Sequence, residues 1–83
     1  MEIADIFKIF QENKCNKYSL SAAELVNIAR FVNPNMLLDK SSQDIFYELD
    51  IAELSKSLMP QDEFMTLKKQ GWAIKNDKLI LYQ

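Results

Sequence analysis

Carboxylate side chains are the groups of this 83-residue chain whose number and spacing come nearest to a reactive site. Asp44, Glu48 and Asp50 lie in one short stretch, and carboxylate oxygens are the ligands that calcium and magnesium prefer. The stretch lacks the spacing of a calcium-binding loop, so we expect these acids on the solvated face of a helix. Asp62 and Glu63 follow a proline, where acidic side chains suit the first turn of a helix. We therefore predict no metal site.

Three features of the composition narrow the chemistry further. The chain has no histidine, which removes the commonest general base, the histidine-dependent catalytic triads and the histidine-containing zinc sites. Its one cysteine excludes thiolate clusters, and its one glycine excludes the glycine-rich loops that hold phosphates and dinucleotides. We expect neither an enzyme nor a bound cofactor.

The single cysteine, Cys15, cannot form an internal disulfide, which fits a reducing compartment. It lies in a polar run between Lys14 and Lys17, so we expect an exposed thiol whose pKa the lysines lower slightly. The acidic N-terminal region is unlike a signal peptide, and no apolar run approaches membrane-spanning length. These features predict a soluble, cytoplasmic protein that does not bind membranes.

Basic side chains are concentrated near the end of the sequence. Residues 1–65 carry six Lys or Arg against eleven Asp or Glu, whereas residues 66–83 carry four Lys against one Asp. The four lysines are candidates for contacts with phosphate: Lys68, Lys69, Lys75 and Lys78. An acidic body with a basic end restricts which surface can meet which partner.

Apolar periodicity predicts a mainly α fold that ends in one β-hairpin, as a small single-domain helical bundle. The expected helices cover residues 3–12, 22–32, 42–58 and 61–70, and the expected strands cover residues 72–75 and 78–82. Residues 36–38 are expected to form a short apolar bridge folded onto the core.

Local signals set the helix boundaries. Ser21 and Glu24 form a capping-box pattern at the start of the second helix, and Pro34 ends that helix. Residues 42–58 form either one helix or two that break at Asp50, where a second capping pattern begins. Helical spacing of apolar residues across the junction favours a single helix.

Gly71 follows Lys68-Lys69-Gln70, so it is expected to end the last helix in a left-handed conformation. The residues after it predict a hairpin with its turn at Asn76 and Asp77. One face of this hairpin should be buried and carries Trp72, Ile74, Leu79 and Leu81. The other face carries Ala73, Lys75, Lys78, Ile80 and Tyr82. Two lysines, Lys75 and Lys78, are then directly opposed, which is unfavourable unless an acidic group lies between them.

The order of elements in the second half of the chain resembles a winged-helix domain. Residues 49–58 look like the first helix of a helix-turn-helix, residues 64–72 resemble the end of a recognition helix, and the hairpin resembles a wing. The resemblance covers residues 49–83 and implies DNA binding, with the start of the second helix in the major groove. The residues at that place include Asp62 and Glu63, whose charges repel phosphate.

The leading hypothesis is a small non-catalytic protein-binding module, a regulator, adaptor or inhibitor that docks on a larger macromolecule. Its expected contact residues are Lys75, Lys78, Ile80, Tyr82 and Ile9. Aromatic and aliphatic side chains ringed by charge are typical of protein contacts, and the outer edge of the last strand offers backbone groups to a partner strand.

Two alternatives remain. One is a winged-helix DNA-binding regulator in which Lys68, Lys69, Lys75 and Lys78 contact backbone phosphates. The other is a self-associating structural component, a homo-oligomer in which Ile3, Phe7 and Ile9 meet across a two-fold axis.

Overall fold

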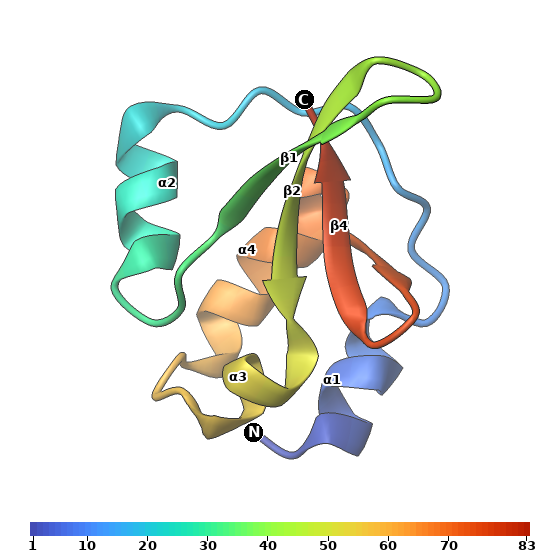
Figure 1. The fold of residues 1–83 in the computed structure, drawn as a ribbon. Coiled ribbons are helices and arrows are strands. Elements are labelled where there is room, and N and C mark those ends of the chain that lie inside the picture. The colour runs from blue at the N-terminus through green and yellow to red at the C-terminus, as the bar shows by residue number, and fades with distance from the viewer.

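A four-stranded antiparallel sheet, with helices packed on one of its faces, forms the centre of the protein (Figure 1). The computed structural model describes the whole range Met1–Gln83. In chain order the elements are α1 (Ile3–Phe10), α2 (Ala22–Ala29), β1 (Asn35–Asp39), β2 (Asp44–Asp50), α3 (Ile51–Lys56), α4 (Gln61–Gln70), β3 (Ala73–Lys75) and β4 (Lys78–Tyr82). The fold is α+β, so the prediction of a mainly helical bundle with a single hairpin is wrong.

The largest correction concerns residues 42–58, which do not form one helix. Residues Asp44–Asp50 form β2, in which Ile45, Tyr47 and Leu49 share one face, with the period of two of a strand. The helical spacing that favoured a single helix joined residues of β2 to residues of α3, and that match was coincidental. The predicted apolar bridge at residues 36–38 is also a strand, since it lies within β1.

The alternative of two helices is wrong as well, because a strand precedes Asp50; only the break at Asp50 and the start of a helix after it are confirmed. The Ala52 N–H donates to Asp50 Oδ1 at 2.9 Å, so Asp50 is the N-cap of α3. The capping box of α2 is also present: the Glu24 N–H donates to Ser21 Oγ at 3.2 Å, and the Ser21 N–H donates to Glu24 Oε1 at 3.0 Å. Helix α4 has its predicted bounds, whereas α1 and α2 end earlier than predicted.

The sheet has the strand order β1-β2-β4-β3. The hairpin of β3 and β4 has the predicted register, in which Lys75 pairs with Lys78 and Ala73 pairs with Ile80. Strand β4 also pairs with β2 along its other side, so the expected free edge of residues 78–82 is wrong. Beyond Ala73, the first residue of β3, residues 16–18 lie beside the end of β4. Lys17 forms a parallel bridge with Tyr82, and the Tyr18 N–H donates to the Tyr82 carbonyl at 2.8 Å. The edge strands of the sheet are β1 and the three-residue β3.

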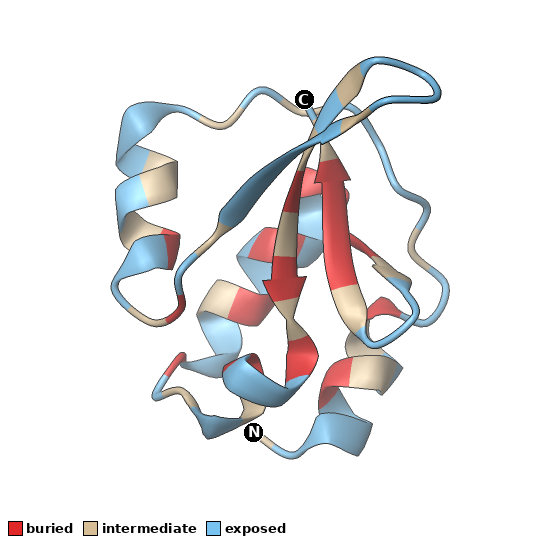
Figure 2. Cartoon of the chain, in the orientation of Figure 1, coloured by how far each residue is buried: buried red, intermediate tan, exposed pale blue.

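The hydrophobic core lies between the inner face of the sheet and helices α1, α3 and α4 (Figure 2). Its largest fully buried side chains are Trp72, Phe10, Phe64, Ile6, Leu49, Ile51, Leu54, Leu67, Leu79 and Leu81. Each buried aliphatic or aromatic side chain contributes roughly 1.5–3 kcal/mol relative to an exposed one. The indole N–H of Trp72 donates to Gln70 Oε1 at 3.0 Å, so the one polar atom of this ring is satisfied within the core.

Gly71 joins α4 to the sheet in the expected left-handed conformation, with φ of 96°. Its N–H donates to the carbonyl of Lys68 at 3.1 Å, which satisfies one group at the helix end. The Asn16 N–H donates to the Gly71 carbonyl at 3.2 Å, so the N-terminal segment lies against this residue. A Cβ at position 71 would lie 2.8 Å from Asn16 Cβ.

We predict that Gly71→Ala destabilises the protein by about 1–3 kcal/mol, because alanine is strained at this φ and its Cβ also meets Asn16. Urea denaturation measures the loss. In the Asn16→Gly background the steric contact is removed, so the same substitution should be less costly there. An equal loss in both backgrounds would show that the contact with Asn16 does not matter.

The carboxylate of Glu24 is one of the contacts that attach helix α2 to the rest of the protein, beside the buried Ile28 and the Asn27–Glu63 hydrogen bond. Glu24 Oε2 accepts hydrogen bonds from the Tyr18 hydroxyl and from Gln70 Nε2, each at 2.7 Å. Together with the Ser21 bonds, these contacts connect the start of α2 to the end of α4. The Tyr18 hydrogen bond, followed by those from Ser21, lowers the pKa of the Glu24 carboxyl from its ordinary value.

A carboxyl whose pKa is lowered by folding stabilises the protein above its unfolded pKa, and this stabilisation is lost as the pH falls through the folded pKa. We predict that Glu24→Gln lowers the free energy of unfolding at neutral pH and that the difference from wild type shrinks in acid. Urea denaturation at neutral and acid pH tests this. The exposed Glu12 provides a control, since Glu12→Gln should change stability by no more than about 0.5 kcal/mol. A pH-independent effect of Glu24→Gln would contradict the prediction.

Candidate functional site

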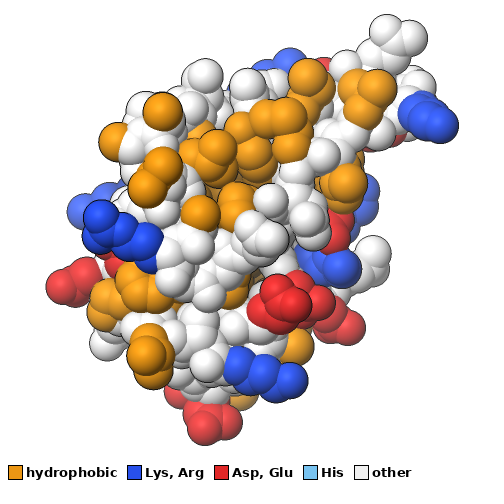
Figure 3. Space-filling view, turned by 60° about the vertical axis from the view of Figure 1, so that its left-hand side comes forward, with side chains coloured by type: hydrophobic (Ala, Val, Ile, Leu, Met, Phe, Trp, Pro, Cys, Tyr) orange, Lys and Arg blue, Asp and Glu red, His pale blue; other side chains and the backbone are white.

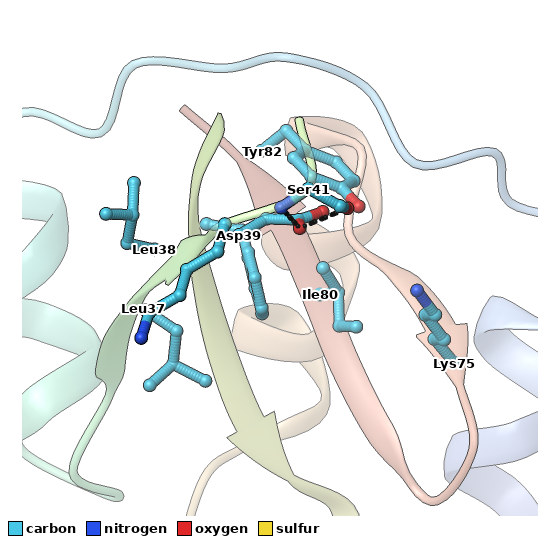
Figure 4. Close-up of a pocket in the computed structure, with 9 residues that line it drawn as sticks. Leu37, Leu38, Asp39, Ser41, Lys75, Ile80 and Tyr82 are labelled. Atoms are coloured by element: carbon cyan, nitrogen blue, oxygen red, sulfur yellow. Dashed lines mark hydrogen bonds between the residues drawn. The ribbon is translucent and has the colours of Figure 1, made fainter. Parts of the chain in front are cut away.

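The outer face of the sheet, on the side away from α1, α3 and α4, is the candidate functional site. Alternation along the paired strands places residues of all four strands on it: Leu37 and Asp39 from β1, Phe46 and Glu48 from β2, Ala73 and Lys75 from β3, and Lys78, Ile80 and Tyr82 from β4. Figure 4 shows Leu37 on β1, Ile80 and Tyr82 on β4, and Lys75 on β3. We call it the outer sheet face.

A hollow of about 530 Å³ lies on the outer sheet face. It is lined by Leu37, Leu38, Asp39, Lys40, Ser41, Phe46, Lys75, Ile80 and Tyr82. The rings of Phe46 and Tyr82 lie 5.7 Å apart, tilted by 54°, which is a favourable aromatic geometry. Ile80, only 7% exposed, lies between the strands at the base of the hollow. The centre of the hollow is therefore apolar.

Charged groups surround this apolar centre. The opposed pair Lys75 and Lys78 is relieved by an acid from β2, since Lys78 Nζ lies 2.8 Å from Glu48 Oε1. The hydrogen bond and the charge of Glu48 raise the pKa of Lys78. Lys75 is exposed and forms no ion pair, so its charge is available at one side of the hollow.

An acid lies at the other side of the hollow. Asp39 Oδ1 accepts hydrogen bonds from the Ser41 hydroxyl at 2.7 Å and from the Ser41 N–H at 3.0 Å (Figure 4). These bonds, with further ones from Ser42, lower the pKa of the Asp39 carboxyl. Asp39 is therefore a fixed negative charge at neutral pH, opposite the positive charge of Lys75.

The structure brings together three of the five residues expected to contact a partner, since Lys75, Ile80 and Tyr82 all line the hollow. Lys78 lies on the same face beside them. Ile9 does not, because it belongs to α1 and packs against the core. Ile80 was expected to be exposed, and this is wrong: it lies on the central strand β4 and is only 7% exposed.

Sequence reasoning missed the contributions of β1 and β2, which are Leu37, Asp39 and Phe46. A partial signal lay in residues 47–50, where apolar and polar residues alternate, but Ile45, Phe46 and Tyr47 are three consecutive apolar residues. Residues 36–38 gave no such signal, because three consecutive apolar residues fit a strand and a buried helix turn equally well.

The four candidate phosphate-binding lysines do not form one surface. Lys75 and Lys78 lie on the outer sheet face, whereas Lys68 and Lys69 lie at the end of α4, which packs behind the sheet (Figure 1). The hairpin turn does not stand free as a wing, because the Ile51 N–H donates to the Asp77 carbonyl at 3.2 Å. The turn is thereby held against the start of α3.

Cys15 differs from expectation in its chemistry. Its Sγ lies 3.3 Å from the Ile80 carbonyl oxygen, beside β4. Removal of water from the sulfur raises the pKa of the thiol, and this outweighs the lowering by the Tyr82 backbone and by Lys75. The expected lowering of the Cys15 pKa is therefore wrong, although the residue is exposed as predicted.

No family model, curated protein or solved structure matched this chain in comparisons with known proteins. No three His, Cys, Asp or Glu side chains lie together in an arrangement that would hold a metal ion. None of the helices has the length and apolar character needed to cross a membrane.

Proposed function

We propose that the protein is a small non-catalytic protein-binding module whose partner docks on the outer sheet face. The observation that supports the proposal is the uncovered hollow in which Leu37, Phe46, Ile80 and Tyr82 form an apolar centre between charged groups. An apolar centre with aromatic anchors and a polar rim is typical of protein–protein interfaces.

The form of the hollow favours a side chain of a protein partner. It is open on the face of a sheet, and its volume of about 530 Å³ is large enough for one or two large side chains. Lys75 lies at one side of the hollow and Asp39 with the neighbouring Lys40 at the other, so charges of both signs can orient a polar partner. A partner that inserts an apolar side chain between two charged groups of its own would fit this arrangement.

A nucleic-acid partner has less support. DNA binding by this chain would draw on lysines that lie on two sides of the sheet, and the first turn of α4 carries Asp62 and Glu63. Glu63 is also occupied, since its Oε2 accepts a hydrogen bond from Asn27 Nδ2 at 2.9 Å. We therefore rank DNA binding, the alternative that the sequence offered, below the protein-binding module.

We predict that Tyr82→Ser and Phe46→Ser each weaken partner capture by at least about tenfold, because each removes an aromatic contact at the centre of the surface. The immobilised protein is incubated with a lysate of the cells that produce it, with and without nuclease, and bound proteins are identified by mass spectrometry. Circular dichroism establishes that each variant is folded.

Leu58→Ser provides the matched control, because Leu58 is 91% exposed and lies outside the hollow. This variant should capture the same proteins as wild type. Capture that survives both aromatic substitutions would exclude the outer sheet face as the docking site. Capture that is abolished by nuclease would favour the DNA-binding alternative instead.

A further inference from the structure

Strand β1 is an unprotected edge of the sheet. Met36, Leu37 and Leu38 are 52%, 40% and 59% exposed, and Ile45 of the neighbouring strand is 40% exposed. Figure 3, turned to bring α2 and this side of the sheet forward, shows hydrophobic side chains gathered there. Proteins usually protect an edge strand with lysine, proline or a bulge, and none of these interrupts Asn35–Asp39.

The backbone groups that β1 offers at this edge can be assigned from its pairing. The Gln83 N–H donates to the Ile45 carbonyl at 2.9 Å, so the polar groups of Ile45 face β4. Leu38 pairs with Ile45 and Met36 pairs with Tyr47, two residues along. In an antiparallel ladder the direction of these groups alternates along a strand, so the N–H and C=O of Met36 and Leu38 point away from the sheet.

We infer that two copies of this chain associate by antiparallel pairing of β1 with β1, about a two-fold axis that passes through Leu37. In this register Met36 of one copy faces Leu38 of the other, and each such pair exchanges two backbone hydrogen bonds. The two pairs satisfy all the outward-pointing groups of Met36 and Leu38 in both copies. The two sheets become one continuous sheet.

Side chains and charges favour this register over its neighbours. Leu37 meets Leu37 of the second copy, and Asp39 faces the neutral Asn35, so no like charges are directly opposed. A register centred on Leu38 would instead place Leu37 opposite Asp39 and Met36 opposite Lys40. A register centred on Met36 would place Leu38 opposite Pro34, which has no N–H to donate. Of the three registers, only the one centred on Leu37 pairs every apolar residue of β1 with another apolar residue.

The expected dimer is weak. A pairing of five residues on each side gives an interface below the roughly 1,200 Å² of stable complexes, so dissociation in the micromolar range or above is expected. Sedimentation velocity over a concentration series that reaches the millimolar range should show a reversible shift from monomer to dimer. A monomer at every concentration would overturn the inference.

The two-fold axis gives a charge test of the register. Leu37→Lys and Leu37→Glu should each weaken dimerisation by at least about tenfold, because residue 37 faces its own copy and like charges then meet. An equimolar mixture of the two variants should restore a dimer that contains one of each. Leu58→Lys and Leu58→Glu, at an exposed position elsewhere, should dimerise as wild type does. Failure of the mixture to restore association would overturn the Leu37-centred pairing.

A disulfide gives an independent measure. Residues in a directly opposed pair that exchanges no hydrogen bonds have Cα atoms about 4.5 Å apart, which lies within the range of a disulfide. Leu37→Cys in a Cys15→Ser background should therefore form a cross-linked dimer on mild oxidation, whereas Leu58→Cys in the same background should not. Tyr82→Ser should leave dimerisation unchanged, so failure of this inference and failure of the proposed partner site give different results.

Discussion

The pairing of β4 between β2 and β3 is the constraint on which the rest of the structure depends. Leu79, Ile80 and Leu81 are all buried, so this strand is apolar on both faces. A buried strand must pair its backbone donors and acceptors on both sides, because an unpaired buried polar group is costly. The three residues of β3 supply one side, and β2 supplies the other. Because β2 supplies the second set of hydrogen-bond partners for β4, Asp44–Asp50 is extended and not helical.

The same pairing determines the electrostatics of the outer sheet face. Two opposed lysines in an isolated hairpin would repel each other, and β2 places Glu48 against Lys78 to relieve this. Lys75 is left without an ion pair, at the edge of an apolar hollow. The charge that the candidate site presents is thus a result of which strand lies beside β4. Strand β1 lies one strand further out and, like β3 at the opposite side, is an edge of the sheet.

Features with local causes were predictable from the sequence. The capping box of α2, the left-handed Gly71 and the register of the β3–β4 hairpin all depend on residues close together in the chain, and all three are confirmed. The candidate site was predicted only in part. Lys75 and Tyr82 were identified from the hairpin alone, whereas Leu37 and Phe46 reach the same hollow through pairing of strands distant in the sequence.

By itself the sequence determined where α1, α2 and α4 begin, where α4 ends and how the last hairpin turns, because these depend on backbone geometry and on hydrogen bonds within a few residues. Only the tertiary structure decided that residues 44–50 form a strand, because their apolar pattern fits both a helix and a strand. The strand forms because it pairs with β4, which is buried and needs hydrogen-bond partners on both sides. The tertiary structure likewise decided which face carries the hollow and which strand is left as an edge. Neither segment by itself specifies which distant strand it pairs with.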